Sequence, residues 1–214
     1  ALGTSMATIV FTSIASLRAH HSREAVNWLV VKRITPGIFC GTLAGSVVAA
    51  RLSGNFLKGF FAVFTFFVAW QMLLNARPHS SRQLPGSGGL FGAGGVIGCI
   101  SSLVGIGGGS MSVPFLVWCN LPARTAIGTS AALGFPIALS GGIGYLLNGI
   151  GAAGLPPYSV GYIYLPALVG IAVTSYLAAP LGARLAHSLP VSQLKKGFAL
   201  LLIATGVKML YGII

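Results

Sequence analysis

Six apolar segments, each close to the length that crosses a lipid bilayer, recur along this chain of 214 residues. A helix needs roughly 20 apolar residues to span the hydrocarbon core of a membrane. Only 7% of the residues are charged, whereas soluble domains carry roughly 25%. The sequence therefore predicts an all-α integral membrane protein with several spans and excludes a water-soluble globule. The predicted spans are residues 1–17, 34–50, 59–74, 126–147, 162–185 and 197–214.

Short motifs in the first part of the chain return later in the same order. The opening ALGTS, residues 1–5, returns as AIGTS at residues 126–130. Because a missed repeat misassigns a whole fold, we interpret the chain as a first repeat at 1–75, a basic connecting loop at 76–88 and a second repeat at 89–214, all in one membrane domain. Further matches pair Pro36 with Pro166, Arg51-Leu52 with Arg184-Leu185, Lys58-Gly59-Phe60 with Lys196-Gly197-Phe198, and Met72-Leu73 with Met209-Leu210.

A glycine cluster divides the second half near its start. Residues 89–124 contain an arm from Leu90 to Val104, the run GIGGG, and a second arm from Met111 to Trp118. Each arm is short for a full span, and a Gly-rich break followed by Pro114 does not continue a regular helix. Backbone groups freed in a membrane must be satisfied by protein or by a watery cavity, so we predict a broken or re-entrant helix pair. The first half lacks such a segment, and we expect its counterpart upstream of residue 1, in a chain truncated at its N-terminus.

The helix that follows this break begins with backbone N–H groups that have no partner within the helix. Together with the aligned peptide dipoles, these groups attract anions, and transporters built from repeats place interrupted helices at their substrate sites. The same glycines are equally compatible with close packing of helix backbones. A nucleotide site is disfavoured, because no Walker lysine follows the glycines and no acidic residue lies about 20 positions further on.

The sequence GIGGGSMSVP at residues 105–114, followed by AIGTS at 126–130, resembles the sulfite exporter TauE/SafE family of membrane transporters, and the resemblance covers almost the whole chain. It implies transport of small sulfur-containing anions, such as sulfite or organosulfonates, across the bacterial cytoplasmic membrane, with export as the implied direction. The substrate-binding positions that it implies are Gly107, Gly108, Gly109, Ser110, Pro114, Gly128, Thr129, Ser130, Gly3, Thr4 and Ser5.

The charges are strongly unbalanced, since thirteen basic residues face a single acid, Glu24, and give a net charge of +12. This balance suits an anionic substrate, and it suits equally the cytoplasmic loops of any multi-pass membrane protein. If the glycine segment makes a single crossing, the loops carry six basic residues on each side. If it enters and leaves on one side, only Arg51 and Lys58 remain in loops on the other side, and the two halves are inverted repeats; we favour this second arrangement. No acid falls in a span, which argues against a carboxylate proton relay. The cations that share one side are then Arg18, Arg23, Lys32, Arg33, Arg77, Arg82, Arg124, Arg184, Lys195 and Lys196.

Other classes of function stay open at this point. An anion channel would use the same donors while remaining open, and a membrane subunit that does not transport would need no substrate site. We expect no enzyme, because no His or acid lies in a span beside a serine. We expect no metal or cofactor, because Cys40, Cys99 and Cys119 lack metal-ligand spacing. A small anion and the lipid bilayer are the expected partners, nucleic acid is not, and a homodimer is compatible with the sequence.

Overall fold

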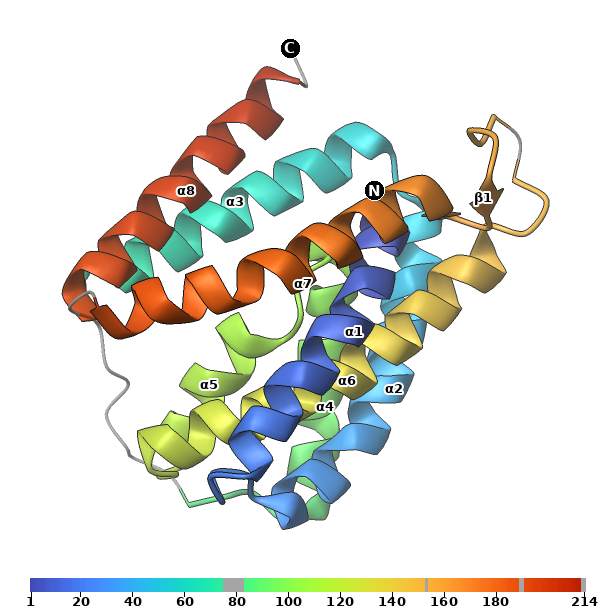
Figure 1. The fold of residues 1–214 in the computed structure, drawn as a ribbon. Helices are drawn as coiled ribbons and strands as arrows, with labels where there is room; N and C mark the ends of the chain where they lie inside the picture. The colour runs from blue at the N-terminus through green and yellow to red at the C-terminus, as the bar shows by residue number, and fades with distance from the viewer. Residues whose placement is uncertain (75–82, 153, 189–190, 213–214) are drawn as a thin grey trace. The chain divides into compact units, whose positions relative to one another are not determined.

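The computed structural model of the chain describes residues 1–74, 83–152, 154–188 and 191–212. Within them the chain forms eight helices and one short β-hairpin (Figure 1). The helices are α1 (Leu2–His21), α2 (Trp28–Arg51), α3 (Gly54–Leu73), α4 (Ser87–Val104), α5 (Gly109–Trp118), α6 (Ala123–Asn148), α7 (Leu165–Ser188) and α8 (Val191–Tyr211), and the hairpin pairs β1 (Ser159–Val160) with β2 (Ile163–Tyr164).

These helices agree with the all-α membrane fold that the sequence predicts. The six predicted spans fall on α1, α2, α3, α6, α7 and α8, and the two predicted arms fall on α4 and α5. Among the described residues, α2, α3, α4 and α6 are long and apolar enough to cross a membrane. The prediction that the first arm is short for a span is wrong. Ser87, Gly88 and Gly89 join α4 and bring it to 18 residues, about 27 Å at 1.5 Å per residue.

The helices divide into two compact units that are not continuous in sequence. Unit 1 comprises residues 1–51 and 78–172, and it holds α1, α2, α4, α5, α6, the hairpin and the first part of α7. Unit 2 comprises residues 52–77 and 173–214, and it holds α3, the rest of α7 and α8. Each unit takes helices from both predicted halves. Much of the connecting loop predicted at 76–88 lies outside the described residues.

Glycines bring α2 and α4 of unit 1 into backbone contact. On α2, Gly37, Gly41 and Gly45 recur at every fourth position, which places them on one face of the helix. A Cβ atom on Gly37 would overlap the carbonyl oxygen of Phe91, and one on Gly41 would overlap that of Gly95. The contacts advance in the same direction along both helices, so α2 and α4 are parallel. Close approach through small residues is a common way for membrane helices to associate.

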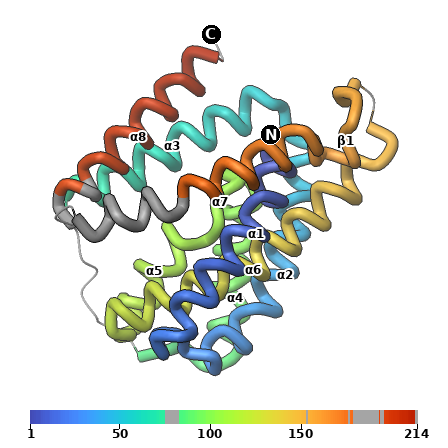
Figure 2. Tube along the Cα trace, viewed as in Figure 1, coloured from blue at the N-terminus to red at the C-terminus, as the bar shows by residue number. Residues whose placement is uncertain are grey.

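The helix α1 lies antiparallel against α6, the most deeply buried of the four membrane-length helices. The backbone of Gly141 packs against Met6, and Gly134 lies beside Ser13. One turn beyond Gly141 along α6, Gly144 packs against Ser46 of α2. Figure 1 and the tube in Figure 2 show the result, in which α2, α4 and α6 rise in the view while α1 descends beside them.

In unit 2, α3 and α8 form an antiparallel pair. Lys58, near the start of α3, donates from Nζ to the carbonyl oxygen of Gly212, which follows the last residue of α8 (2.8 Å). Further along the pair, Gly206 of α8 packs against Thr65 and Phe66 of α3. Because the last carbonyls of a helix have no partner within it, the lysine satisfies one of them and ties the two helices together.

Candidate functional site

The glycine run separates α4 from α5 and makes a sharp bend. Gly105, directly after α4, adopts a φ of 74°, a left-handed conformation that glycine reaches without a side-chain clash. The first residue of α5 is Gly109, preceded by Gly108, and no side chain in the described part of the chain caps this helix start. The N–H groups of Gly109 and Met111 donate to the carbonyls of Gly107 and Gly108, which leaves Ser110 as the first-turn residue whose N–H has no partner within the described residues. The predicted break is therefore present as two helices joined by residues 105–108.

Beyond the bend, the chain returns along α5 to the end of unit 1 where α4 begins. Because α4 is parallel to α2, both helices begin at the same end. Leu116, in the last turn of α5, is fully buried against Val30 in the first turn of α2. The same apolar cluster includes Leu121, which lies just before α6, and Ala126 in the first turn of α6. The helices α4 and α5 thus form a hairpin whose bend is the glycine run (Figure 1).

Two hydroxyl groups from other helices hold the C-terminal end of α4. Ser5 of α1 donates from Oγ to the carbonyl oxygen of Gly105 (2.9 Å). Tyr145 of α6 donates its phenolic O–H to the carbonyl oxygen of Ser102 (2.7 Å). Carbonyls at this end of a helix have no amide partner within it. Side-chain hydroxyls therefore donate hydrogen bonds to carbonyls at the C-terminal end of α4, which carries the negative end of the helix dipole.

The N-terminal end of α5 is different, because a hydroxyl without a partner faces it. Ser130 of α6 lies beside Gly109, with its Oγ 3.8 Å from the place that a Cβ on this glycine would take. Ser130 is only 3% exposed, and its Oγ is one of three buried side-chain oxygens in the described part of the chain without a hydrogen-bond partner. Ile9 and Ile137 lie against the two preceding glycines. An uncapped helix start, a free hydroxyl and apolar walls together suit an anion.

The threonines of the two Gly-Thr-Ser motifs make matching bonds to the segments before α2 and α7. Thr129 accepts at Oγ1 a hydrogen bond from the N–H of Asn27, the residue before α2 (2.9 Å). Thr4 accepts at Oγ1 a bond from the N–H of Tyr164, the residue before α7 (3.0 Å). Both threonines are buried. The motif of each half thus contacts a segment of the other half.

The glycines of the two motifs make the same reciprocal contact. A Cβ atom on Gly128 would overlap the carbonyl oxygen of Ala25, and one on Gly3 would stand 2.6 Å from the carbonyl oxygen of Tyr162. In both places, the residue with this carbonyl lies two positions before the residue whose N–H donates a hydrogen bond to the threonine. These glycines therefore let the helix starts approach the opposite segments closely.

We expect Thr129→Val to lower the unfolding temperature of the detergent-solubilised protein. Valine keeps the shape of the side chain and removes the acceptor for the N–H of Asn27. An unsatisfied donor costs about 1–3 kcal/mol when buried, and we expect about 1 kcal/mol here because Asn27 is only partly buried. Thr12→Val is the matched control, since that hydroxyl is exposed and bonds only within α1. Equal unfolding temperatures for the two variants would contradict the role of this bond.

Apart from Pro114, the site residues that the sequence predicts fall into two groups in the structure. Ser5, Ser130 and residues 107–110 lie at the bend between α4 and α5. Pro114 is the sixth residue of α5, where its missing N–H leaves the carbonyl of Ser110 without its usual helical partner. The other four make the reciprocal contacts of α1 and α6 described above, and they are Gly3, Thr4, Gly128 and Thr129.

Tyr145 is the residue at the bend that sequence reasoning misses. Its hydroxyl partner lies 43 positions away along the chain, and no short motif includes both. The only local signal is a phenolic O–H inside an apolar span, because a buried Tyr usually finds a hydrogen-bond partner.

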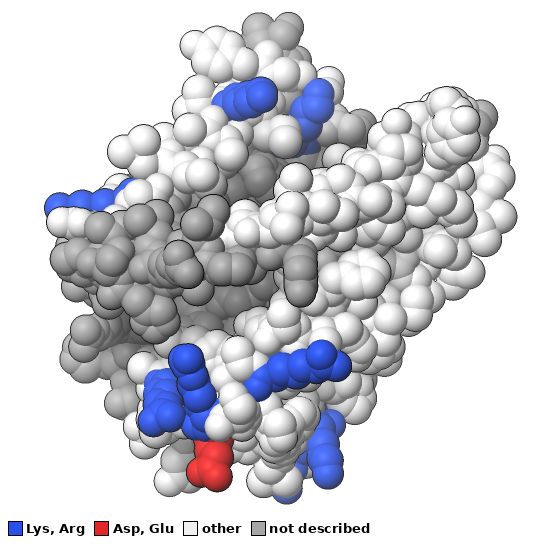
Figure 3. Space-filling model, viewed as in Figure 1, with Lys and Arg blue, Asp and Glu red and all other residues white. Residues whose placement is uncertain are grey.

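Basic side chains gather at the end of unit 1 where α2 and α6 begin. Arg124, in the first turn of α6, donates from Nη2 to the carbonyl oxygen of Arg23 in the loop after α1 (3.0 Å). Glu24, the one acid of the chain, lies in the same loop, and Figure 3 shows Lys and Arg side chains around it. Arg51 is the last residue of α2 and belongs to the opposite end. The predicted placement of Arg77 and Arg82 on the basic side lies outside the described residues.

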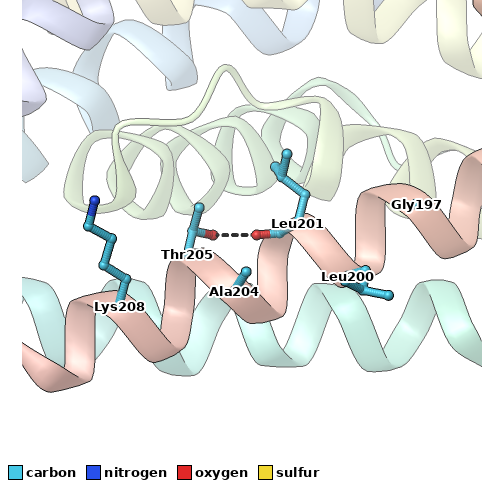
Figure 4. Close-up of a pocket in the computed structure, with 6 residues that line it drawn as sticks. All are labelled: Gly197, Leu200, Leu201, Ala204, Thr205 and Lys208. Carbon is cyan, nitrogen blue, oxygen red and sulfur yellow. Dashed lines mark hydrogen bonds between the residues drawn. The ribbon is translucent and has the colours of Figure 1, made fainter.

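A shallow groove in unit 2 offers little to an anion. Among the described residues, those that line it belong to α8, and Lys208 is the one charged residue among them (Figure 4). Thr205 donates from Oγ1 to the carbonyl oxygen of Leu201 in the same helix (3.0 Å). A single apolar helix face with one lysine near its end is typical of a lipid-facing surface, along which the long side chain reaches towards water.

Membrane-length apolar helices packed around a hydroxyl-lined bend define a polytopic helical membrane protein. The family model Sulfite exporter TauE/SafE matches residues 1–209, and the chain belongs to this family. The family that the glycine motif and AIGTS indicated is thereby confirmed.

The relatives are membrane transporters by description. A probable membrane transporter protein of Haemophilus influenzae is 39% identical over 211 residues, which cover 98% of this chain and 80% of that protein. Probable membrane transporter protein YunE of Bacillus subtilis is 24% identical over 235 residues, covering 99% and 80%. A probable membrane transporter protein of Methanocaldococcus jannaschii is 26% identical over 219 residues, covering 98% and 78%. No solved structure matches the chain. Family and relatives together indicate a multi-pass membrane transporter.

Proposed function

We propose that this transporter carries small sulfur-containing oxyanions, of the sulfite or organosulfonate type, and binds them at the start of α5. The observation that carries the proposal is the buried Oγ of Ser130, which has no partner in the described part of the chain and faces Gly109. A buried hydroxyl without a partner costs stability, so a ligand that accepts its hydrogen bond accounts for its presence. The sulfur chemistry and the export direction rest on the family description.

The charge distribution around the bend supports an anion. The peptide dipoles of a helix place about half a positive elementary charge at its N-terminus, and the start of α5 has no side-chain cap that would satisfy it. The opposite partial charge, at the end of α4, is met by the hydroxyls of Ser5 and Tyr145. Glu24, the only acid of the chain, is exposed in the loop after α1. Donors for an anion are therefore present at the bend without a carboxylate to repel it.

Inverted repeats would give this site access from either side of the membrane. Matching helices pair in antiparallel fashion, α1 with α6 and α3 with α8, as a two-fold axis in the membrane plane requires. The bonds of Thr4 and Thr129 to the segments before α7 and α2 follow the same symmetry. We infer that the repeats move against each other, and that the α4–α5 hairpin enters and leaves the bacterial cytoplasmic membrane on the basic side.

Counterflow in proteoliposomes tests this function. Vesicles loaded with unlabelled sulfite or methanesulfonate should take up the labelled anion faster than empty vesicles, and the uptake should saturate, because a carrier returns faster when loaded. Flux that does not respond to the anion inside would indicate a channel. Absence of flux for both anions, from protein with a cooperative unfolding transition, would overturn the substrate assignment.

A further inference from the structure

Tyr145 reaches the bend from the central helix of unit 1. Its side chain is 3% exposed, and its O–H donates to the carbonyl oxygen of Ser102, which is fully buried (2.7 Å). Ser102 lies in the last turn of α4, three residues before the left-handed Gly105. The bond therefore connects α6 directly to the end of the helix from which the bend departs.

Two further contacts fix the position of Tyr145. Gly3 of α1 packs directly against its Cβ, which a side chain on that residue would prevent. Its backbone carbonyl accepts a hydrogen bond from the N–H of Tyr162, in the hairpin before α7 (3.2 Å). Because the backbone and the Cβ of Tyr145 are held on both sides, its phenol presents the O–H to Ser102 from a defined place.

We propose that Tyr145 is a positioning residue for the substrate site, whose O–H sets where α4 ends and thereby where α5 begins. This inference rests on the proposed function, since it concerns the same site. Only residues 105–108 join the two helices, so a displacement of Ser102 is passed on to Gly109. The hydrogen bonds that the start of α5 and Ser130 donate to the anion in the proposed site depend on distance and angle. A misplacement of these donors by about 1 Å therefore strongly weakens anion binding.

A purely structural role for Tyr145 makes a different prediction. Loss of the O–H would then lower the stability of unit 1 and leave the affinity for the anion unchanged. A positioning role raises KM while the maximal rate stays close to that of the wild type, because the donors to the anion move and the alternation of the repeats does not change. KM and the maximal rate, measured separately, therefore distinguish the two roles.

The experiment compares Tyr145→Phe with Tyr158→Phe in the counterflow assay, with methanesulfonate as the probe. Tyr158 is 77% exposed and serves as the matched control. We expect Tyr145→Phe to raise KM by about three- to tenfold, the size of effect that one hydrogen bond supports, and the control to change nothing. Replacement of Tyr145 by 4-aminophenylalanine, which keeps an N–H donor at the same place, should restore the wild-type KM.

A folded Tyr145→Phe variant with the wild-type KM would overturn the inference. If this variant gives no folded protein, the 4-aminophenylalanine variant decides, since a wild-type KM supports the inference and a raised KM overturns it. Failure of the proposed function has another signature, because Ser130→Ala would then also keep the wild-type KM, or the wild type would show no saturable counterflow. If KM rises for Ser130→Ala and stays at the wild-type value for Tyr145→Phe, the positioning role of Tyr145 is overturned and the proposed function still holds.

Discussion

Replacing Gly41 with alanine should leave little or no folded protein. A Cβ atom at this position would overlap the carbonyl oxygen of Gly95, a backbone atom that no side-chain rotation can move away. The parallel pair of α2 and α4 would have to separate along its whole length, because Gly37 and Gly45 also pack closely against α4. Extra atoms in a packed interior typically cost about 1–3 kcal/mol, and we expect the upper end of this range or more here. The measurement is the yield of monodisperse protein in detergent and its unfolding temperature.

Gly92→Ala is the matched control for this prediction, since Gly92 lies on α4 itself and has nothing within 4 Å of a built Cβ. Gly95→Ala is a second control, because the nearest atom to its Cβ would be the carbonyl oxygen of Gly37 at 3.8 Å, an ordinary contact. Both controls should keep the yield and the unfolding temperature of the wild type. If Gly41→Ala also behaves like the wild type, the close packing of α2 on α4 does not hold in the protein.

Ser130→Ala should lower the affinity for the transported anion without lowering the stability of the fold. A hydrogen bond to a charged group contributes about 1.5–3 kcal/mol, which corresponds to a roughly ten- to hundredfold change in affinity. The same substitution removes a buried hydroxyl that has no partner in the described part of the chain. The unfolding temperature of the anion-free protein should therefore stay constant or rise. KM in counterflow and unfolding in detergent measure the two effects.

Two further variants test the role of Ser130 in binding the anion. Gly109→Ala places a methyl group in ordinary contact with Ser130 Oγ, 3.8 Å away, so it should fill the anion's place and leave the helices where they are. Ser140→Ala is the control on α6, because the buried Ser140 hydroxyl bonds to the carbonyl of Pro136 in its own helix (2.6 Å). If Ser130→Ala lowers the unfolding temperature and leaves KM unchanged, Ser130 has a role in packing and none in binding the anion.

The membrane fold could be predicted from the sequence because long apolar runs with few charges leave the chain few alternatives. The exact ends of the helices were harder to predict from the sequence. Hydropathy predicts a span from residue 126, whereas α6 begins at Ala123 directly after Pro122, since a helix start depends on local backbone geometry as well as on apolarity. In the same way α4 takes in Ser87, Gly88 and Gly89, residues that the predicted arm leaves out.

The matched motifs support the predicted repeat only in part. Pro36 is the ninth residue of α2, but Pro166 is the second residue of α7, where a proline lacks no helical hydrogen bond. The two do not hold equivalent places in their helices. The equal lengths of α2 and α7, 24 residues each, and the reciprocal bonds of Thr4 and Thr129 are stronger signs of a repeat, and they require coordinates.

The bend of the candidate site could be predicted because the run GIGGG at residues 105–109 holds four glycines, which disfavour a continuous helix; Pro114, by contrast, lies inside α5. The partners of the hydroxyls in the Gly-Thr-Ser motif at residues 3–5 could not be derived from spacing. Thr4 finds its donor 160 positions away, and Ser5 finds its acceptor 100 positions away. Such pairs are set by the packing of α1 against α6 and the hairpin. The sequence therefore indicates which hydroxyls lie near the site, but it does not separate the hydroxyls that bond to protein from that of Ser130.

The most direct test of the anion site is a crystal structure with bromomethanesulfonate bound, in which the anomalous signal of bromine locates the ligand. We expect a peak beside Gly109, with sulfonate oxygens about 3 Å from Ser130 Oγ and from the N–H of Ser110, since the N–H groups of Gly109 and Met111 already donate to the carbonyls of Gly107 and Gly108. A peak elsewhere, for example beside Arg124 at the basic end, or no peak at the bend at a saturating concentration, would contradict the proposed site.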